Sequence, residues 1–434
     1  MRVPPVVIHL SLASAVVLGA VSLTLPSTPA DSRAASSAID ALSAEQYLRH
    51  VSYLASDAMG GRANGSAALD TAAEYIAGRF RSWGLTPGGD GGTFFQPFEL
   101  AAGAASGPKT QVRNVIAALP GRDPALRDQW VVVGAHYDHL GLGERGSLAP
   151  SQRGQIHHGA DDNASGTSGV LELARLAATR TRGFRRSVLF ATFAGEELGL
   201  LGSSHFANHP TVPAGAMAAM INMDMIGRPR NGRVFVGGVG TSPVLRPWLD
   251  ELNRRVGLQL DYSDSGFGSS DHTSFTVKHV PVLFFFSGLH GDYHKPTDTS
   301  DKIDARGARR VLSLVYLMME RLATDPARPE WTAVAESAPS GGGGAGYGPY
   351  FGSIPDFGDA GGGVLFADVR PGSPAAKAGL RAGDLLVEFD GTPVQNLYDF
   401  TYALRAKKPG DAVRVVVRRN DMPVAATVLL EARR

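Results

Sequence analysis

The chain reads SVLFATFAGEELGLLGS from Ser187 to Ser203. An apolar, strand-like run therefore ends in two adjacent carboxylates, Glu196 and Glu197, and a segment of small residues that can begin a helix follows them. In open α/β sheets, ligands tend to bind at such junctions. If other ligand residues converge there, one of two neighbouring carboxylates can bind a metal ion while the other transfers a proton.

Apolar runs of this kind alternate with amphipathic helical patterns along much of the chain. The runs predict strands at 93–100, 111–119, 130–135, 187–193, 217–223, 234–237 and 280–286. The first of these is interrupted by Pro97, which favours an edge position. Helical patterns cover 43–56, 66–84, 165–179, 198–208, 243–256 and 305–324. This alternation predicts an α/β fold in which a mostly parallel central sheet is covered by helices on both faces.

The first 30 residues have the pattern of an export signal. Arg2 precedes an apolar run at 6–25, and cleavage is expected at or shortly after Ala30. An uncleaved membrane anchor is the alternative, but His9 and several Ser and Gly residues make the run less hydrophobic than a typical span. We therefore expect a periplasmic or extracellular protein without stable membrane insertion.

Charge and cysteine content exclude several classes of protein. The chain has 42 Lys and Arg against 41 Asp and Glu, so it lacks the basic excess of a nucleic-acid-binding protein. Because it has no cysteine, any metal must be held by histidine and carboxylate side chains. We predict a signal peptide at 1–30, a flexible mature N-terminus at 31–42, a catalytic α/β domain at 43–325, a Gly-rich linker at 326–346 and a small domain at 347–434.

Five predicted loops place histidine or carboxylate side chains at one edge of the predicted sheet. They contain the segments His136-Tyr137-Asp138-His139, Asp161-Asp162-Asn163, Glu196-Glu197, Asp224 and Asp292-Tyr293-His294. Any one of these alone is more often a cap, a packed ring or a solvated charge. Together, two histidines and three carboxylates form a complete set of nitrogen and oxygen ligands for two zinc ions that share a bridging carboxylate.

Other chemistries fit the sequence less well. The glycines of 141–146 match a dinucleotide fingerprint, but Pro150 and Gly154 stand where its helix should begin. Neither the G-x-S-x-G elbow of serine hydrolases nor an H-E-x-x-H zinc helix is present. Ser270-Asp271-His272 is interpreted as a helix cap or as support for the site, because adjacent residues do not by default form a catalytic triad.

The blocks GAHYDHLG, GADDNASG, FAGEELGLLGS, NMDMIG and DYHKPTDT resemble, in order and spacing, the two-zinc aminopeptidases of metallopeptidase family 28 over residues 43–324. The resemblance implies a zinc exopeptidase fold and two zinc ions per chain. It also implies roles for individual residues: Asp162 as the bridging carboxylate, His136 and Asp224 as ligands of one zinc, Glu197 and His294 as ligands of the other, Glu196 as general base, Asp138 as the partner of His136, and Tyr293 as a group that polarises the substrate carbonyl.

One departure from the family concerns substrate recognition. Relatives often carry an inserted protease-associated domain before the first ligand histidine, but here only a dozen residues separate Leu100 from Val112. The loops at 141–156 and 264–270 are therefore expected to contact substrate. His157 and His158 are not ligand positions of the family and are treated as loop residues.

The C-terminal segment resembles a PDZ domain of the bacterial protease type, because residues 369–386, VRPGSPAAKAGLRAGDLL, match the characteristic run of that family. Such domains bind peptide C-termini as an added strand. Residues 350–353 stand at the position of the carboxylate-binding loop, but Pro355 removes a donor from the strand that would pair with the peptide. A domain retained for packing or autoregulation is an equally good alternative.

These observations predict an exported dizinc aminopeptidase that hydrolyses N-terminal residues from peptides, with a possible peptide or protein ligand for the PDZ domain. Three alternatives stay open. A glutaminyl cyclase shares the resemblance but uses one zinc, a carboxypeptidase needs basic residues that we do not locate, and a non-enzymatic binding protein would have lost its ligands.

Overall fold

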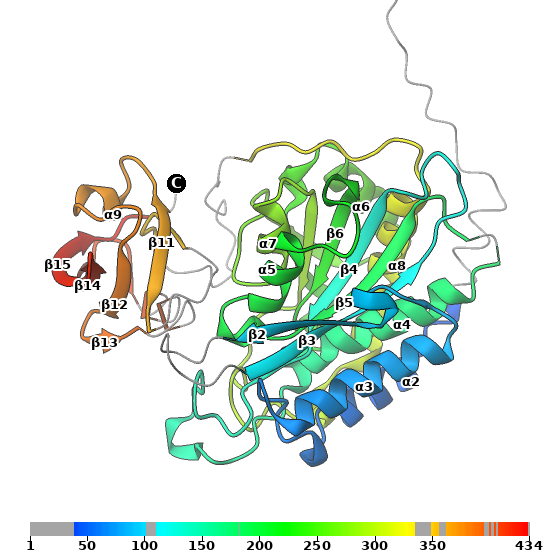
Figure 1. Cartoon of the computed structure of the whole chain (residues 1–434), viewed down its shortest axis with the longest axis horizontal. Helices are drawn as coiled ribbons and strands as arrows, with labels where there is room; N and C mark the ends of the chain where they lie inside the picture. Colours follow the sequence, from blue (N-terminus) through cyan, green and yellow to red (C-terminus); the bar gives the residue numbers. More distant parts are fainter. Residues whose placement is uncertain are drawn as a thin grey trace, which may run out of the picture.

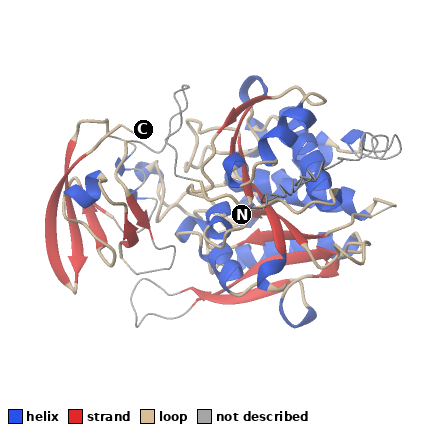
Figure 2. Ribbon diagram, turned by 90° about the horizontal axis from the view of Figure 1, so that it is seen from above, coloured by secondary structure: helices blue, strands red, loops and turns tan. Residues whose placement is uncertain are grey.

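The computed structural model describes residues 39–100, 110–181, 183–334, 349–355, 362–394, 399–400, 403–404 and 407–432. The predicted signal peptide, most of the predicted mature N-terminus and much of the predicted linker lie outside these residues. The described part contains a nine-stranded and a six-stranded sheet (Figure 1, Figure 2). None of the helices in these ranges combines the length and the apolar character that a membrane span requires.

The nine-stranded sheet has the order β1-β3-β5-β4-β6-β9-β7-β8, and β2 pairs with β3. Its central strands, β5, β4, β6 and β9, are parallel, whereas β3 and β7 pair antiparallel with their inner neighbours. The expected parallel sheet is thus confirmed at the centre, within a mixed α/β sheet. The strand bounds are β1 Thr86–Pro87, β2 Phe95–Leu100, β3 Thr110–Leu119, β4 Trp130–His136, β5 Ser187–Phe193, β6 Met217–Met223, β7 Arg233–Gly237, β8 Gln259–Tyr262 and β9 Val282–Phe286.

Helices cover both faces of this sheet, because its central strands are apolar on both sides. Every residue of β5 and β6 is buried. Helices α2, α3, α4 and α8 pack on one face, α5 and α7 pack on the other, and α6 packs against α8 (Figure 1). The helix bounds are α2 Ala44–Leu54, α3 Ala67–Ser82, α4 Gly166–Ala178, α5 Leu201–Asn208, α6 Leu245–Asn253, α7 His272–Thr276 and α8 Ala305–Thr324.

The segment between β5 and α5 differs from the predicted helix at 198–208. Gly195, Gly199 and Leu200 all adopt left-handed backbone conformations, with φ of 73°, 111° and 63°. These residues bound a short 3-10 turn that contains Glu196 and Glu197, so α5 begins only at Leu201. The two glutamates therefore lie in a separate turn that precedes the helix.

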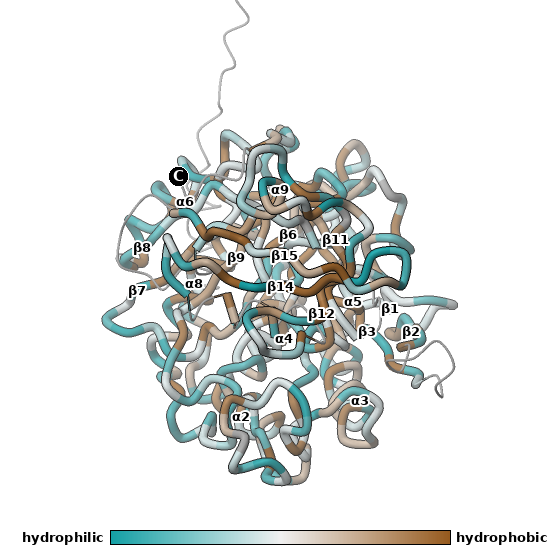
Figure 3. Tube along the Cα trace, turned by 90° about the vertical axis from the view of Figure 1, so that its left-hand side faces the viewer, coloured by the Kyte–Doolittle hydropathy of each residue, from teal (hydrophilic) through white to brown (hydrophobic). Residues whose placement is uncertain are grey.

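The C-terminal sheet belongs to a small unit with its own apolar core. Phe351 packs against the rings of Phe366, Phe389 and Phe400. Figure 3 faces this unit and shows hydrophobic stretches in its strands. Its elements are β10 Ser353–Pro355, β11 Val364–Val369, α9 Pro374–Lys377, β12 Leu385–Phe389, β13 Thr392–Pro393, β14 Ala412–Arg419 and β15 Met422–Leu429.

The strand expected to receive a peptide in this unit is short. β10 pairs antiparallel with β11 over only three residues, and its register shifts between Ile354 and Pro355. Pro355 is the last residue of the strand, so it removes a backbone donor at the end where residues 356–361, outside the described ranges, begin.

Candidate metal centre

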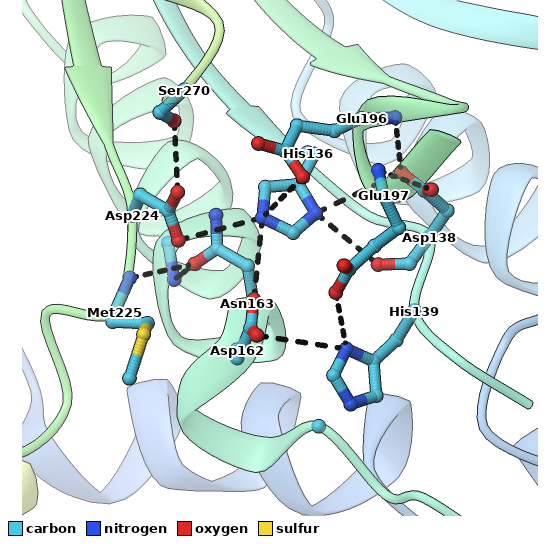
Figure 4. A network of polar contacts seen from close by, with 12 residues as sticks. His136, Asp138, His139, Asp162, Asn163, Glu196, Glu197, Asp224, Met225 and Ser270 are labelled. Atoms are coloured by element: carbon cyan, nitrogen blue, oxygen red, sulfur yellow. Dashed lines mark hydrogen bonds and ion pairs between the residues drawn. The ribbon is translucent and has the colours of Figure 1, made fainter. Parts of the chain in front are cut away.

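The five predicted ligand residues converge at the carboxyl edge of the parallel strands. The Nε2 atom of His136, at the end of β4, lies 3.4 Å from an oxygen of Asp162 and 3.4 Å from an oxygen of Asp224. The Nε2 atom of His294 lies 3.1 Å from the other oxygen of Asp162 and 3.2 Å from Glu197. Asp162 therefore stands between two groups of predicted ligand atoms, as a bridging carboxylate requires. Figure 4 shows the Asp162 carboxylate beside His136 and His139.

The loop that carries Asp162 is fixed by hydrogen bonds on both sides. The carboxylate of Asp298 accepts from the backbone amides of Asp161 and Asp162, both at 3.0 Å. Asn163 donates to the carbonyl of Met223 at 3.0 Å. Since Met223 directly precedes Asp224, this bond ties the Asp162 loop to the strand end that carries another ligand.

The carboxylate of Asp138 holds the turn that carries the two glutamates. It accepts from the backbone amides of Glu196 at 3.2 Å and Glu197 at 3.3 Å, and from the side-chain amide of Asn64 at 2.7 Å. The expected contact with His136 differs in detail: Nδ1 lies 3.7 Å from the carboxylate but 3.2 Å from the backbone carbonyl of Asp138. The reason is that the chain turns after β4, which brings the carbonyl nearer to the ring.

Two further side chains hold ligand carboxylates. His139, for which the sequence predicts no role, places Nδ1 2.7 Å from Glu197 Oε1. Ser270 donates to Asp224 Oδ2 at 2.8 Å, so the support expected from the Ser270-Asp271-His272 segment comes from its first residue. Asp271 is the residue before α7 but makes no side-chain capping bond, so the cap reading was wrong. The only sequence signal for His139 was its place three residues after His136.

The carboxylate oxygens that face one another fit a bound cation. Asp162 Oδ2, Glu197 Oε2 and Asp224 Oδ1 are buried, and histidine Nε2 atoms lie 3.1, 3.2 and 3.4 Å from them, but no described residue makes a hydrogen bond of good geometry to these oxygens. An oxygen left in this state costs free energy, so such atoms ordinarily have a partner. Imidazole nitrogen and carboxylate oxygen are ligands that zinc accepts in four-coordinate sites. The residues present therefore fit zinc.

The two glutamates sit in different electrostatic surroundings. Burial raises the pKa of Glu196 well above its usual range, and the charges of Asp224 and Glu197 add to this effect. Burial acts in the same direction on Glu197, but His294 and a hydrogen bond from His139 outweigh it and lower the pKa of Glu197 to about 2. A carboxyl group with a raised pKa is suited to proton transfer, and one with a lowered pKa is suited to ligation.

The loop at 141–156 is joined directly to His294, one of the predicted ligands. The carbonyl of Gly146 accepts from Nδ1 of His294 at 2.9 Å, and the amide of Leu148 donates to the carbonyl of His294 at 2.9 Å. The ring of Tyr293 stacks on the ring of His294, with 4.0 Å between centroids. This loop therefore orients a predicted ligand and borders the site.

The two histidines beside this loop have separate places. His157 is buried inside the loop, where its Nε2 lies 2.8 Å from the hydroxyl of Ser147 and its ring occupies the space next to Gly143. His158 lines an open surface cavity of about 440 Å³, and its Nε2 lies 2.8 Å from Asp57. None of the eight predicted site residues lines that cavity.

Comparison with known proteins identifies the kind of domain that contains this site. Residues 114–319 match the model of peptidase family M28, and residues 352–430 match the model of the PDZ domain. The chain carries an M28 peptidase domain followed by a PDZ domain. Leupeptin-inactivating enzyme 1 of Streptomyces exfoliatus is 28% identical over 257 residues, which are 59% of this chain and 51% of that protein. The chain thus spans about half the length of this curated relative.

Solved structures share the M28 fold. The LapA aminopeptidase of Legionella pneumophila matches with a TM-score of 0.54 and 22% identity, covering 68% of this chain and 75% of that one. A glutaminyl cyclase of Porphyromonas gingivalis matches with a TM-score of 0.53 and 19% identity, covering 64% and 98%. At these identities the likeness concerns the fold alone, so the activity has to be argued from the site of the M28 domain.

Proposed function

We propose that this chain is an exported aminopeptidase that hydrolyses the N-terminal peptide bond of peptides with two zinc ions. The observation that carries the proposal is the position of Asp162, whose two oxygens face His136 on one side and His294 on the other. Asp224 would complete the first group of ligands and Glu197 the second. Zinc, when bound, supplies a Lewis acid that polarises the scissile carbonyl and lowers the pKa of a bound water.

Glu196 is the group best placed to move the proton. Its carboxylate is buried, and Oε2 lies 3.7 Å from His136 Nε2, so it borders the ligands. We assign it the role of accepting a proton from the attacking water and delivering it to the leaving amine. Asp138 keeps this group in place through the backbone amide of Glu196. Tyr293, held against His294, is assigned to the substrate carbonyl oxygen.

The substitution Glu196→Gln tests this assignment in purified mature protein. We expect hydrolysis of aminoacyl-p-nitroanilides to fall by about 10²–10⁴-fold, because the amide cannot accept the proton. Two equivalents of zinc should remain bound, since the ligands are unchanged. Glu45→Gln, at a glutamate whose side chain is 83% exposed, is the matched control and should keep full activity. Substantial residual turnover of Glu196→Gln would remove Glu196 from the role of base.

A glutaminyl cyclase is the second candidate, because one structural neighbour carries that activity on the same fold. That reaction would release ammonia from a peptide with N-terminal glutamine and leave a cyclised product, whereas an aminopeptidase would release free glutamine. Mass spectrometry of the products together with the zinc content distinguishes them. A peptide library with blocked N-termini extends the test to carboxypeptidase activity, since only an enzyme that trims C-termini would act on it.

Export and the PDZ domain belong to the same proposal. The apolar run at 6–25 lies outside the described residues, and its sequence pattern is the basis for proposing a periplasmic or extracellular enzyme. N-terminal sequencing of the secreted protein checks cleavage near Ala30. For the PDZ domain we propose a peptide or protein ligand, and deletion of 347–434 tests whether that ligand affects hydrolysis.

A further inference from the structure

Arg62 is a fully buried arginine for which the proposed reaction has no role. It follows Gly60 and Gly61, and all three residues adopt left-handed backbone conformations, with φ of 49°, 73° and 50°. Glycine tolerates this conformation, but for arginine it costs free energy. Residues held in this way persist only where the surrounding structure determines them, and they cluster at functional sites.

The guanidinium of Arg62 joins segments that are distant in sequence. It donates to the backbone carbonyls of Tyr137 at 2.8 Å, His158 at 2.9 Å and Gly159 at 2.9 Å, and also to that of Leu54. Tyr137 follows the ligand His136, and Gly159 begins the loop that carries Asp162. One planar group therefore fixes the distance between the end of β4, which carries His136, and the loop before α4 that carries Asp162.

The backbone of Gly61 and Arg62 is hydrogen-bonded to the segment that follows β4. Its carbonyl accepts from the amide of His139 at 3.1 Å, and the carbonyl of Gly61 accepts from the amide of Gly141 at 3.0 Å. A Cβ atom on Gly61 would lie 2.5 Å from the carbonyl oxygens of Gly141 and His157, so only glycine fits. The turn at residues 60–62 is thus held in place both by the guanidinium of Arg62 and by backbone hydrogen bonds.

The charge of Arg62 lies among buried carboxylates. Burial lowers its pKa to about 10, while Asp162, Asp138, Asp298 and Glu197 act in the opposite direction. A guanidinium with that pKa remains a cation at neutral pH. Buried charges are tolerated only with opposite charges or hydrogen bonds nearby, and here both are present.

We propose that Arg62 is a positioning residue of the metal centre: it locks the Asp162 loop to the end of β4. The inference rests on the proposed metal-dependent function. It predicts that Arg62 acts on zinc affinity and on kcat through the ligands, without contacting substrate.

The substitutions Arg62→Lys and Arg186→Lys form a matched pair. Arg186 is equally buried but donates to the carbonyl of Leu322 at 3.0 Å and to Gln129 at 2.8 Å, beside the amino end of β5. Lysine keeps the charge but loses the planar set of donors. We expect Arg62→Lys to raise the zinc dissociation constant by about 10–100-fold, as removal of groups that orient ligands does. Arg186→Lys should lower only the melting temperature.

Competition with a chromophoric chelator measures zinc affinity without reference to turnover. Kinetics should show a lower kcat for Arg62→Lys with little change in KM. The inference is overturned if both variants lose similar stability while neither changes zinc affinity. If all forms bind zinc but none hydrolyses peptides, the aminopeptidase proposal fails, and a weaker zinc affinity of Arg62→Lys still supports the positioning role.

Hydrogen exchange of the unmodified protein covers the case in which Arg62→Lys does not fold. Adding zinc to metal-free protein should slow amide exchange in residues 59–64 together with residues 159–163, because Arg62 connects the two segments. Protection confined to residues 159–163 would contradict the inference.

Discussion

The two ends of the parallel strands bury polar side chains for different purposes. At the amino end, the hydroxyl of Ser187 donates to the carbonyl of Arg127 at 2.6 Å and accepts from the amide of Gly121 at 2.8 Å, and Arg186 is bound by Gln129. At the carboxyl end, oxygens of the predicted ligand carboxylates converge beside the Nε2 atoms of His136 and His294, but without hydrogen bonds of good geometry among the described residues. Buried polar groups that pair with one another stabilise the fold, whereas buried acceptors that converge on one point are suited to binding a ligand.

Replacement of the bridging carboxylate should have the largest effect at the carboxyl end. We expect Asp162→Asn to lose at least one equivalent of zinc and about 10³-fold in kcat/KM, since metal-ion catalysis supplies several kcal/mol. Asp161→Asn is the control in the same loop, because the two carboxylate oxygens of Asp161 have other partners, the amide of Gly227 at 2.7 Å and Nε2 of His290 at 3.1 Å. Zinc analysis and kinetics check both variants. Two bound zinc ions in Asp162→Asn would contradict the bridging role.

The amino end should respond to substitution through stability alone. Arg186→Met leaves the carbonyl of Leu322 and the side chain of Gln129 without their donor. Buried acceptors left in this state cost about 1–3 kcal/mol each, so we expect the free energy of unfolding to fall by about 3 kcal/mol. Urea denaturation measures this loss. A change in zinc affinity would show that the two ends are not independent.

Ser270→Ala tests the group that orients Asp224. It removes the donor to Asp224 Oδ2 and should weaken zinc binding by about 10–100-fold, with little loss of stability. Ser274→Ala is the matched control, because Ser274 is also buried but pairs with Ser203 at 3.0 Å. Chelator competition compares the two variants. Equal zinc affinities would remove Ser270 from the metal centre.

Burial of His272 should make the free energy of unfolding depend on pH, with a smaller effect than the substitutions above. Burial lowers the pKa of His272 to about 3, and its ring stacks on Phe284 with 4.4 Å between centroids. Above the ordinary pKa of about 6.5 the ring is neutral in both folded and unfolded protein. As the pH falls below that value, the unfolded chain binds a proton that the folded protein does not, so stability decreases.

The substitution His272→Phe should remove this part of the acid sensitivity. Between about pH 6.5 and pH 4.5, the free energy of unfolding of the unmodified protein should fall by about 2 kcal/mol more than that of the variant. Denaturation at both pH values, with the zinc concentration held constant, checks the difference. Parallel pH profiles would mean that His272 is not held neutral.

Regular elements with strong apolar periodicity could be predicted from the sequence. The bounds of β5, β6 and α8 agree with the expected 187–193, 217–223 and 305–324. By contrast, β8 and α7 were missed. β8 spans only four half-exposed residues, and α7 only five, so neither produces a periodic signal.

The convergence of the five proposed ligand residues could be predicted, because they stand in distinctive short blocks, most of which follow strand ends. The groups around them could not, since their roles depend on contacts between distant segments. Arg62 reaches a carbonyl 97 positions away, and His139 reaches a carboxylate 58 positions away. Likewise, which oxygen of Asp138 lies nearest to His136 is decided by the path of the turn after β4.

The bond between Gly146 and His294 has a consequence for the evolution of specificity. The loop at 141–156 borders the site, yet its backbone carbonyl also orients a ligand, and His157 fills the space that a side chain on Gly143 would need. Insertions or substitutions that reshape this loop for a new substrate would therefore disturb the metal centre as well. A change of specificity would be accommodated more easily through exposed side chains of this loop, such as those of Leu142 and Leu148, than through changes in loop length.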